Sequence, residues 1–249
     1  MAPIIKSQAE REKIRETGRI VAEVLGELRA AVHPGITTDE LDRIALEILK
    51  QRGAKSSSLG YHGYPKSVCT SVNDEVVHGI PGERVLKEGD IVSIDFAAVY
   101  NGWHADSAIT VPVGTVAPEV QHLLKVTEEA LYRGIAAARA GNRLHDISRA
   151  VQQYVEEAGF SVVRQYGGHG VGRSMHEDPQ VLNYIEEGHP NTRLKPGMVI
   201  AIEPMVNMEG KETRVLADDW TVVTADASYS AHFEHTVAIT EGDADILTR

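Results

Sequence analysis

Two aspartates in neighbouring predicted strands are the first residues whose spacing could do chemistry. Asp95 and Asp106 flank Asn101-Gly102, a typical two-residue hairpin turn. A hairpin with its turn there pairs Asp95 with Ala108 and Ala97 with Asp106. Unless a bulge changes this register, both carboxylates project from the same face of the sheet as diagonal neighbours. Two like charges about 4 Å apart repel by about 4 kcal/mol at an effective dielectric near 20. The pair therefore needs protonation, a basic partner or a metal ion, unless it faces water at a sheet edge.

Three further polar residues stand in apolar or glycine-rich surroundings. Glu203 follows the apolar stretch 199–202, Glu234 lies in a second short apolar stretch, and His169 lies among the glycines of residues 167–170. Four carboxylates and one imidazole are too many ligands for one tetrahedral zinc ion. They suit two divalent ions that share bridging carboxylates, as in two-metal hydrolases. For His169 alone, a buried structural role is the ordinary alternative.

Capping patterns and apolar spacing predict the helices that must position these residues. Ser7 with Glu10, and Thr37 with Glu40, fit the capping-box pattern, and Gly53 is a helix stop. The four predicted helices cover about residues 8–32, 37–52, 118–139 and 143–158. Predicted strands cover residues 91–99, 103–111, 199–202 and 235–239. Residues 54–80, rich in Gly, Ser and Tyr, are predicted to be irregular.

The chain also repeats itself. Two pairs of segments match: residues 35–53 with 141–159, and residues 86–95 (LKEGDIVSID) with 194–203 (LKPGMVIAIE). The second match places Asp95 on Glu203. Coincidental likeness of two helix-plus-strand units is one interpretation. The other is two related halves that face each other, each presenting a carboxylate at the end of an equivalent strand.

Composition excludes several classes of protein. The chain has 249 residues and a formal net charge of −11, which argues against nucleic acid as a main ligand. One cysteine, Cys69, rules out an intrachain disulfide and favours a reducing compartment. The charged first 16 residues do not fit a signal peptide, and no run of 18 apolar residues predicts a membrane span. We expect a cytoplasmic enzyme.

The polar motifs, taken in order, resemble those of the type I methionine aminopeptidase family. The matching residues are Tyr61-His62-Gly63-Tyr64-Pro65, Asn73, His78-Gly79-Ile80-Pro81, Asp95, Asp106, Gly168-His169-Gly170, Arg173, His176-Glu177, Glu203-Pro204 and Glu234-His235-Thr236. The resemblance implies the pita-bread fold. This is an α/β (α+β) architecture of two pseudo-symmetric halves, with a curved, mostly antiparallel sheet flanked by helices. It further implies a single catalytic domain over residues 1–249, with halves of about 1–112 and 113–249.

The resemblance also implies a role for each polar residue. Asp95 would chelate one ion, His169 and Glu203 would bind the other, and Asp106 and Glu234 would bridge both. A water or hydroxide between the ions would attack the scissile carbonyl, because two cations lower its pKa and stabilise the oxyanion. Glu203 could also carry the proton to the leaving amine.

Three histidines match the family's substrate-contacting, non-ligand positions. His78 and His176 would hydrogen-bond the substrate amide and the tetrahedral intermediate, with His62 assisting. Spacing alone leaves a structural role open for each of them.

A methionine side-chain pocket is implied at five positions: Tyr61, Tyr64, Cys69, Met175 and Trp220. They offer soft apolar surface suited to a thioether, although ordinary core packing is the alternative. Met175 departs from the phenylalanine expected there, which bears on the pocket's shape. Cys69 as a nucleophile is disfavoured, because no His–Asn/Asp arrangement points to it.

The predicted function is removal of the initiator methionine from nascent chains, with small second residues preferred. The expected cofactors are two divalent ions among Co, Mn, Fe, Zn and Ni. The expected partners are N-terminal Met peptides, nascent chains and, transiently, the ribosome. We expect no direct nucleic-acid or membrane partner, and we expect the protein to be a monomer. The alternatives are an Xaa-Pro aminopeptidase or prolidase of the same fold, and a non-catalytic pita-bread binding module.

Overall fold

Local sequence signals begin and end the helices. The computed structural model describes residues 3–249. Ser7 Oγ accepts from the backbone N–H of Glu10, whose carboxylate accepts from the N–H of Ser7, and Thr37 and Glu40 form the same capping box. Gly53 ends the second helix with φ 66°, a left-handed conformation that favours glycine. The helices are α1 (Gln8–Ala31), α2 (Thr38–Arg52), α3 (Pro118–Ala137) and α4 (Leu144–Glu157), with a 3₁₀ turn at Tyr61–Gly63.

The strands form one large sheet and two small ones. In chain order they are β1 (Lys55–Ser56), β2 (Cys69–Val72), β3 (Glu75–Val77), β4 (Ile91–Tyr100), β5 (Trp103–Pro112), β6 (Ser161–Val162), β7 (Gly168–Gly170), β8 (Glu177–Val181), β9 (Val199–Ile202), β10 (Met205–Asn207), β11 (Thr213–Val215), β12 (Val222–Thr224), β13 (Ser230–His232), β14 (Glu234–Ala238) and β15 (Asp245–Ile246). The large sheet has the order β1-β4-β5-β14-β9-β7-β8, with β2 on β4 and β15 on β14. The small sheets are β13-β10-β6 and β11-β12-β3.

The central hairpin has the register that the sequence predicts. Asp95 lies opposite Ala108, and Ala97 lies opposite Asp106. The turn at Asn101-Gly102 has positive φ at both residues, 51° and 75°, as a type I′ turn requires. Strands β4 and β5 thus present both aspartates on one face of the sheet.

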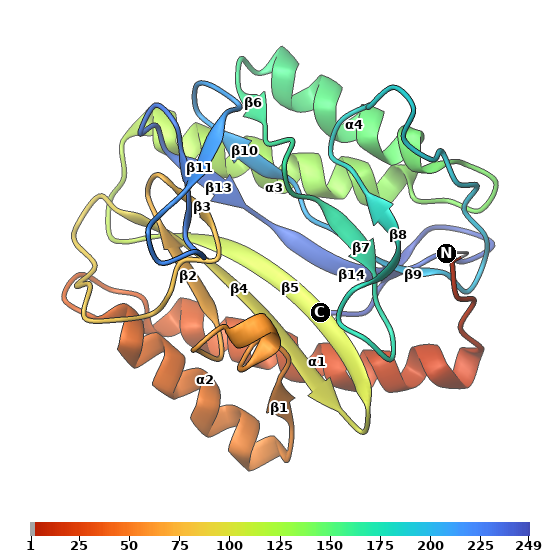
Figure 1. Ribbon diagram of the computed structural model, residues 1–249, viewed down its shortest axis with the longest axis horizontal. Helices are drawn as coiled ribbons and strands as arrows, with labels where there is room; N and C mark the ends of the chain where they lie inside the picture. The colour runs from red at the N-terminus through yellow and green to blue at the C-terminus, as the bar shows by residue number, and fades with distance from the viewer. Residues whose placement is uncertain (1–2) are drawn as a thin grey trace.

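The helices flank this curved sheet in two pairs. Figure 1 shows α1 and α2 along one side of β4 and β5, and α3 and α4 on the opposite side of the molecule. The core packs α1 against the central hairpin through fully buried side chains such as Ile14, Leu28 and Phe96. The predicted mostly antiparallel sheet flanked by helices is therefore confirmed. Among the described residues, no helix combines the length and apolar character needed to cross a membrane.

One prediction from the sequence is wrong. Residues 54–80 are not irregular throughout, because they contain β1, β2 and β3 and the 3₁₀ turn. All four residues of β2, Cys69–Val72, are buried, so the strand shows no alternation of apolar and polar residues. Its pairing with β4 determines its conformation, and such a long-range contact leaves no local pattern. The other predicted elements are present, with ends shifted by one or two residues.

The repeated segments make equivalent backbone hydrogen bonds. Gly35 N donates to Leu86 O at 2.8 Å, and Gly141 N donates to Leu194 O at 3.1 Å. The reverse bonds, from Leu86 N to Ile36 O and from Leu194 N to Asn142 O, are both 2.8 Å long. The matching sequences therefore adopt the same local structure on the two sides of the sheet.

Candidate metal centre and active site

Pairing of β5 with β14 brings the carboxylates of the two halves together. Glu234 lies opposite Ala108 in this pairing. Thr236 Oγ1 accepts from the N–H of Asp106 at 3.0 Å and donates to the carbonyl of Asp106 at 2.8 Å. Ser107 Oγ donates to the carbonyl of Glu234 at 2.6 Å. These bonds fix the backbones that carry Asp106 and Glu234, so the two side chains face the same space.

The side chains converge on one cluster. Ligand atoms of Asp106, His169 and Glu234 all lie within 4.8 Å of one another. His169 Nε2 is 4.0 Å from Asp106 Oδ2 and 3.5 Å from Glu203 Oε1. Buried oxygens Oδ1 of Asp106 and Oε1 of Glu234 have no hydrogen-bond partner among the described residues. Unpartnered buried carboxylate oxygens beside an imidazole nitrogen are acceptors that a divalent cation satisfies, so the donor set fits such an ion.

Burial makes the charged carboxylates costly. Burial raises the pKa of Asp95 to about 6, against a hydrogen bond with Asp106 that lowers it. Burial, followed by the charge of Asp95, raises the pKa of Glu203 to about 8. Burial and the neighbouring carboxylates also raise the pKa values of Asp106 and Glu234 well above their usual range. A cation in the cluster relieves the repulsion between the carboxylates. Without a cation, only protonation of a carboxylate can relieve it.

The glycines around His169 let strands approach closely. A Cβ at Gly168 would lie 2.2 Å from the carbonyl oxygen of Ala201, and a Cβ at Gly170 would lie 2.4 Å from that of Asp178. His169 Nδ1 donates to the carbonyl of Gly170 at 3.0 Å, since a carbonyl only accepts. The ring proton is therefore on Nδ1, and the Nε2 lone pair faces Asp106 and Glu203. Burial lowers the pKa of His169 to about 3, which keeps the ring neutral.

All the residues predicted from the sequence to bind metal or substrate line one cavity. Its volume is about 380 Å³. Its walls include Tyr61, His62, Tyr64, Cys69, His78, Asp95, Asp106, His169, Met175, His176, Glu203, Trp220 and Glu234. The acidic cluster and the apolar side chains are thus parts of one site. His62 is exposed, whereas Tyr64, Cys69 and Met175 are buried.

Aromatic rings and imidazoles pack against one another along the wall. Tyr64 meets Trp220 edge-to-face with ring centroids 5.1 Å apart, and His78 lies 6.1 Å from Trp220. Tyr61 Oη and His176 Nδ1 are 2.8 Å apart. The His169 and His176 ring centroids are 4.2 Å apart. The wall therefore joins apolar surface to two imidazoles next to the carboxylates.

His78 has a left-handed backbone and a neutral ring. Its φ is 59°, and His62 has φ 47°, a region that few side chains occupy. Burial, with a smaller contribution from the charge of His176, lowers the pKa of His78 to about 4. Burial also lowers the pKa of His176. Both rings are neutral near pH 7, and a neutral imidazole can donate one N–H.

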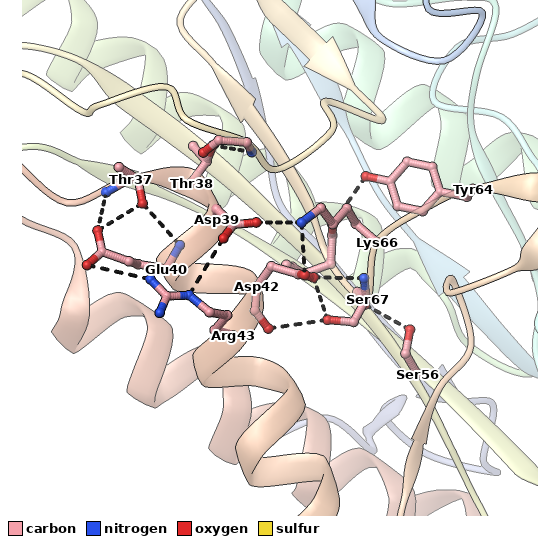
Figure 2. Close-up of polar contacts among 12 residues, drawn as sticks. Thr37, Thr38, Asp39, Glu40, Asp42, Arg43, Ser56, Tyr64, Lys66 and Ser67 are labelled. Carbon is pink, nitrogen blue, oxygen red and sulfur yellow. Dashed lines mark hydrogen bonds and ion pairs between the residues drawn. The ribbon is translucent and has the colours of Figure 1, made fainter.

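The loop that carries Tyr64 is fixed to α2 by polar contacts (Figure 2). Asp42 is buried and accepts from the N–H of Ser67 at 2.8 Å and from its hydroxyl at 2.6 Å. The more exposed Asp39 pairs with Lys66. Tyr64 Oη donates to the carbonyls of Val68 and Gly79. These contacts hold one wall of the cavity against the first helix pair.

Sequence reasoning missed His232, which lies beside Glu203. Its Nε2 is 3.8 Å from Glu203 Oε2, and its side chain is 1% exposed. Both ring nitrogens are buried without a hydrogen-bond partner among the described residues. A signal existed, because His232 stands two positions before Glu234, and residues two apart in extended chain share a face. Other cavity-lining residues that were not singled out are Ser58, Val77, Gln165, Tyr166, Gly167, Gly168, Gln180 and Met205.

A curved antiparallel sheet between two helix pairs, with carboxylates and an imidazole converging at its centre, defines the pita-bread class of metalloprotein. The chain belongs to metallopeptidase family M24, whose model matches residues 12–241. It is 56% identical over 248 residues to methionine aminopeptidase 1 of Bacillus subtilis, and the match covers 99% of each of the two chains. It also matches the structure of methionine aminopeptidase from Thermotoga maritima with a TM-score of 0.97 and 46% identity over the whole of both chains. The resemblance found in the sequence motifs is thereby confirmed.

A more distant structural match supports the fold alone. The prolidase from Pyrococcus horikoshii matches with a TM-score of 0.80 at 22% identity, and the match covers 99% of this chain but 64% of the prolidase. A third of the prolidase therefore has no counterpart in this chain. Membership of a metallopeptidase family makes this protein a hydrolase that depends on divalent metal.

Proposed function

We propose that this protein removes the N-terminal methionine from nascent chains and peptides, with a preference for small second residues. The observation that supports this proposal most directly is that unpartnered carboxylate oxygens of Asp106 and Glu234 and an apolar pocket lie in one cavity. High identity over the full length of methionine aminopeptidases supports the same conclusion.

The residues that would hold metal are the five that the motifs indicate. In this proposal Asp95 would hold one divalent ion, His169 and Glu203 would hold a second, and Asp106 and Glu234 would serve both. Cobalt, manganese, iron, zinc and nickel all suit such a donor set. Bound there, the ions supply an activated water and positive charge for the oxygen of the scissile carbonyl.

The chain's own residues would bind, orient and move protons. Neutral His78 and His176 donate N–H bonds to the substrate amide and to the oxygen that gains charge. Glu203 would take a proton from the attacking water and pass it to the leaving amine. His62 stands at the exposed edge of the cavity and assists.

The pocket would select methionine by apolar contact. Tyr61, Tyr64, Cys69, Met175 and Trp220 surround the side chain in this proposal. Met175 and Cys69 are polarizable and suit a thioether, and the Tyr64–Trp220 pair gives the pocket a rigid aromatic side. Burial raises the pKa of the Cys69 thiol, so it serves as wall rather than nucleophile.

The remaining functional expectations follow from the substrate. Nascent chains carry the initiator methionine, so we infer a cytoplasmic monomer with at most a transient ribosome contact. We infer one catalytic domain over residues 1–249, with halves of about 1–112 and 113–249. The net charge of −11 agrees with the absence of a direct nucleic-acid partner from this proposal.

Mass spectrometry of a peptide set tests the proposal. Met-Ala-Ser, Met-Leu-Ser, Leu-Ala-Ser and Ala-Pro-Ser are incubated with the protein and each of the five metals in turn. We expect release of methionine from Met-Ala-Ser, slow release from Met-Leu-Ser and none from Leu-Ala-Ser. Cleavage of Ala-Pro-Ser alone would indicate the Xaa-Pro class instead. Metal uptake without cleavage of any peptide would indicate a binding module and overturn the proposal.

A further inference from the structure

The N-terminal segment, residues 3–7, lies against the second half of the molecule before α1 begins (Figure 1). The N–H of Lys6 donates to the carbonyl of Gly197 at 2.8 Å. A Cβ at Gly197 would lie 2.8 Å from the carbonyl oxygen of Lys6, and Gly197 has φ 90°. The segment therefore packs directly on the loop that precedes β9.

Lys6 forms a buried ion pair with Glu177. Its Nζ is 2.6 Å from Glu177 Oε2, and the two side chains are 3% and 7% exposed. Among the described residues, it is the only ion pair whose two side chains are both less than a tenth exposed. Removing one partner of a buried pair leaves an uncompensated charge, which is far more costly than the loss of a surface pair.

The other carboxylate oxygen of Glu177 closes the turn of residues 173–177. Oε1 accepts from the N–H of Arg173 at 2.7 Å and from that of Ser174 at 3.3 Å. At Gly172 a Cβ would lie 2.5 Å from Glu177 Oε1 and 2.8 Å from Lys6 Cε. Lys6, Glu177 and the turn are thus packed together without room for another side chain.

This turn carries two residues of the cavity wall. Met175 and His176 both line the cavity. His176 Nδ1 lies 2.8 Å from Tyr61 Oη, and its ring lies 4.2 Å from that of His169. The contacts that fix the turn therefore also fix where the His176 ring meets the substrate.

We propose that Lys6 is a positioning residue: through its ion pair with Glu177 it holds the turn that presents Met175 and His176 to the substrate. The catalytic meaning of this role rests on the proposed function, because His176 receives its task there. None of the five proposed metal ligands belongs to the turn that Lys6 holds, because the carboxylates lie on β4, β5 and β14 and after β9, and His169 lies on β7. We therefore expect metal binding to survive the loss of Lys6. Without Lys6, the buried Glu177 carboxylate moves toward water and draws the turn with it.

Three variants test this role in the full-length protein. Lys6→Met removes the cation, and Arg52→Met is the matched control, because it removes the exposed Arg52–Glu23 pair that joins α2 to α1. The double variant Lys6→Met with Glu177→Gln removes both charges, while the amide oxygen can still accept from Arg173. Readouts are kcat and KM for Met-Ala-Ser, manganese bound per chain, and the His176 ring signals in histidine-labelled NMR spectra, assigned with His176→Gln.

We expect Lys6→Met to lower kcat/KM by about 10- to 100-fold, through both kcat and KM, since a small displacement of a catalytic group costs that much. Its His176 ring signals shift, whereas manganese binding is unchanged. Arg52→Met matches the wild type in all three readouts. The double variant regains kcat/KM to within about threefold, because no unpaired charge stays buried.

Wild-type kcat/KM and His176 signals in Lys6→Met would overturn the inference. If Lys6→Met does not fold, the double variant decides: wild-type His176 signals support the role, and displaced signals refute it. A wild-type protein that releases no methionine, with His176 signals that still shift in Lys6→Met, would refute the proposed function and leave the positioning role standing.

Discussion

The two halves of the molecule share one pattern of helix, β-bridge and strand, which we call the frame. They differ in the loops that this frame supports. In the first half, Thr37 forms a β-bridge with Val85, and in the second half Arg143 forms the equivalent bridge with Arg193. Gly89 and Gly197, the equivalent glycines before β4 and β9, both have φ 90°. Each frame leads into a strand with a carboxylate at the matching position. Glu203 directly follows β9 as the sequence predicts, whereas Asp95 lies inside β4, because the first-half strand continues into the hairpin with β5.

The loops differ in what they contribute and in how they are held. The first half presents Tyr64 on a loop that is bonded to its own helix α2 through Asp42. The second half presents His176 on a turn that is bonded to residue Lys6 of the first half. An imidazole joins the carboxylate cluster from the second half alone, as His169. Equivalent frames therefore set where the carboxylates meet, and the unlike loops set what else the cavity can recognise.

Substitution of the equivalent carboxylates should have the largest effect. We expect Asp95→Ala and Glu203→Ala each to lower kcat/KM by at least about 10³-fold while the fold is retained, because each removes a proposed metal ligand. Circular dichroism checks the fold, and bound manganese checks the site. Full activity in Glu203→Ala would contradict its role and break the equivalence of the halves.

Substitution of one imidazole from each half should have the next largest effect. We expect His78→Ala and His176→Ala each to lower kcat by about 10²-fold, as loss of one donor to a developing oxyanion does. Metal content should stay at the wild-type level, because neither residue is a proposed ligand. A drop in bound metal in either variant would show that the loops, and not the frame alone, hold the ions.

The pH dependence of the Tm tests whether the carboxylates that the frame brings together are buried against one another. The pKa of Glu203 is raised to about 8, so its contribution to stability is full below about pH 4.5 and is lost as the pH rises through 8. The pKa of His169 is lowered to about 3, so its contribution is lost only as the pH falls and is constant above about pH 7. We therefore expect the Tm of chelator-treated protein to fall by about 5 °C between pH 7 and pH 8.5.

The same melting measurement with manganese is the control. A bound cation takes the place of the proton between the carboxylates, so the Tm of the loaded protein should change much less over this range. A Tm of chelated protein that rises with pH would mean that these carboxylates are not buried against one another.

Two aspartates of α2 should give the smallest effects. Asp42→Ala removes the buried carboxylate that accepts from the N–H and the hydroxyl of Ser67, and leaves the hydroxyl only its long contact with the carbonyl of residue 42, so it should cost about 1–3 kcal/mol of stability. Asp39→Ala removes a more exposed pair with Lys66 and should cost less than about 1 kcal/mol. Urea unfolding compares the two variants. Equal losses would contradict the view that buried backbone bonds, rather than the surface ion pair, hold the first-half loop.

The sequence predicted those features that depend on neighbouring residues. The hairpin turn at Asn101-Gly102 set the register that places Asp95 and Asp106 on one face, and this register is confirmed. Capping boxes predicted the starts of α1 and α2. Strand β2 was missed, because its four buried residues show no alternation of apolar and polar side chains and its pairing partners lie at least 20 positions away.

Other parts of the site required the tertiary structure. His232 stands two positions before Glu234, but its approach to Glu203 depends on the pairing of β13 with β10, which the sequence pattern does not show. The pair of Lys6 with Glu177 joins residues 171 positions apart, and no spacing rule predicts such a contact.

The sequence by itself therefore determined the helices, the central hairpin and the kinds of side chain available for metal and substrate, because turns, caps and periodicity act between near neighbours. Only the tertiary structure decided that these side chains share one cavity and which contacts hold its walls. Those contacts form when segments distant in the chain bury their apolar faces together, and the geometry of that packing is a property of the whole fold.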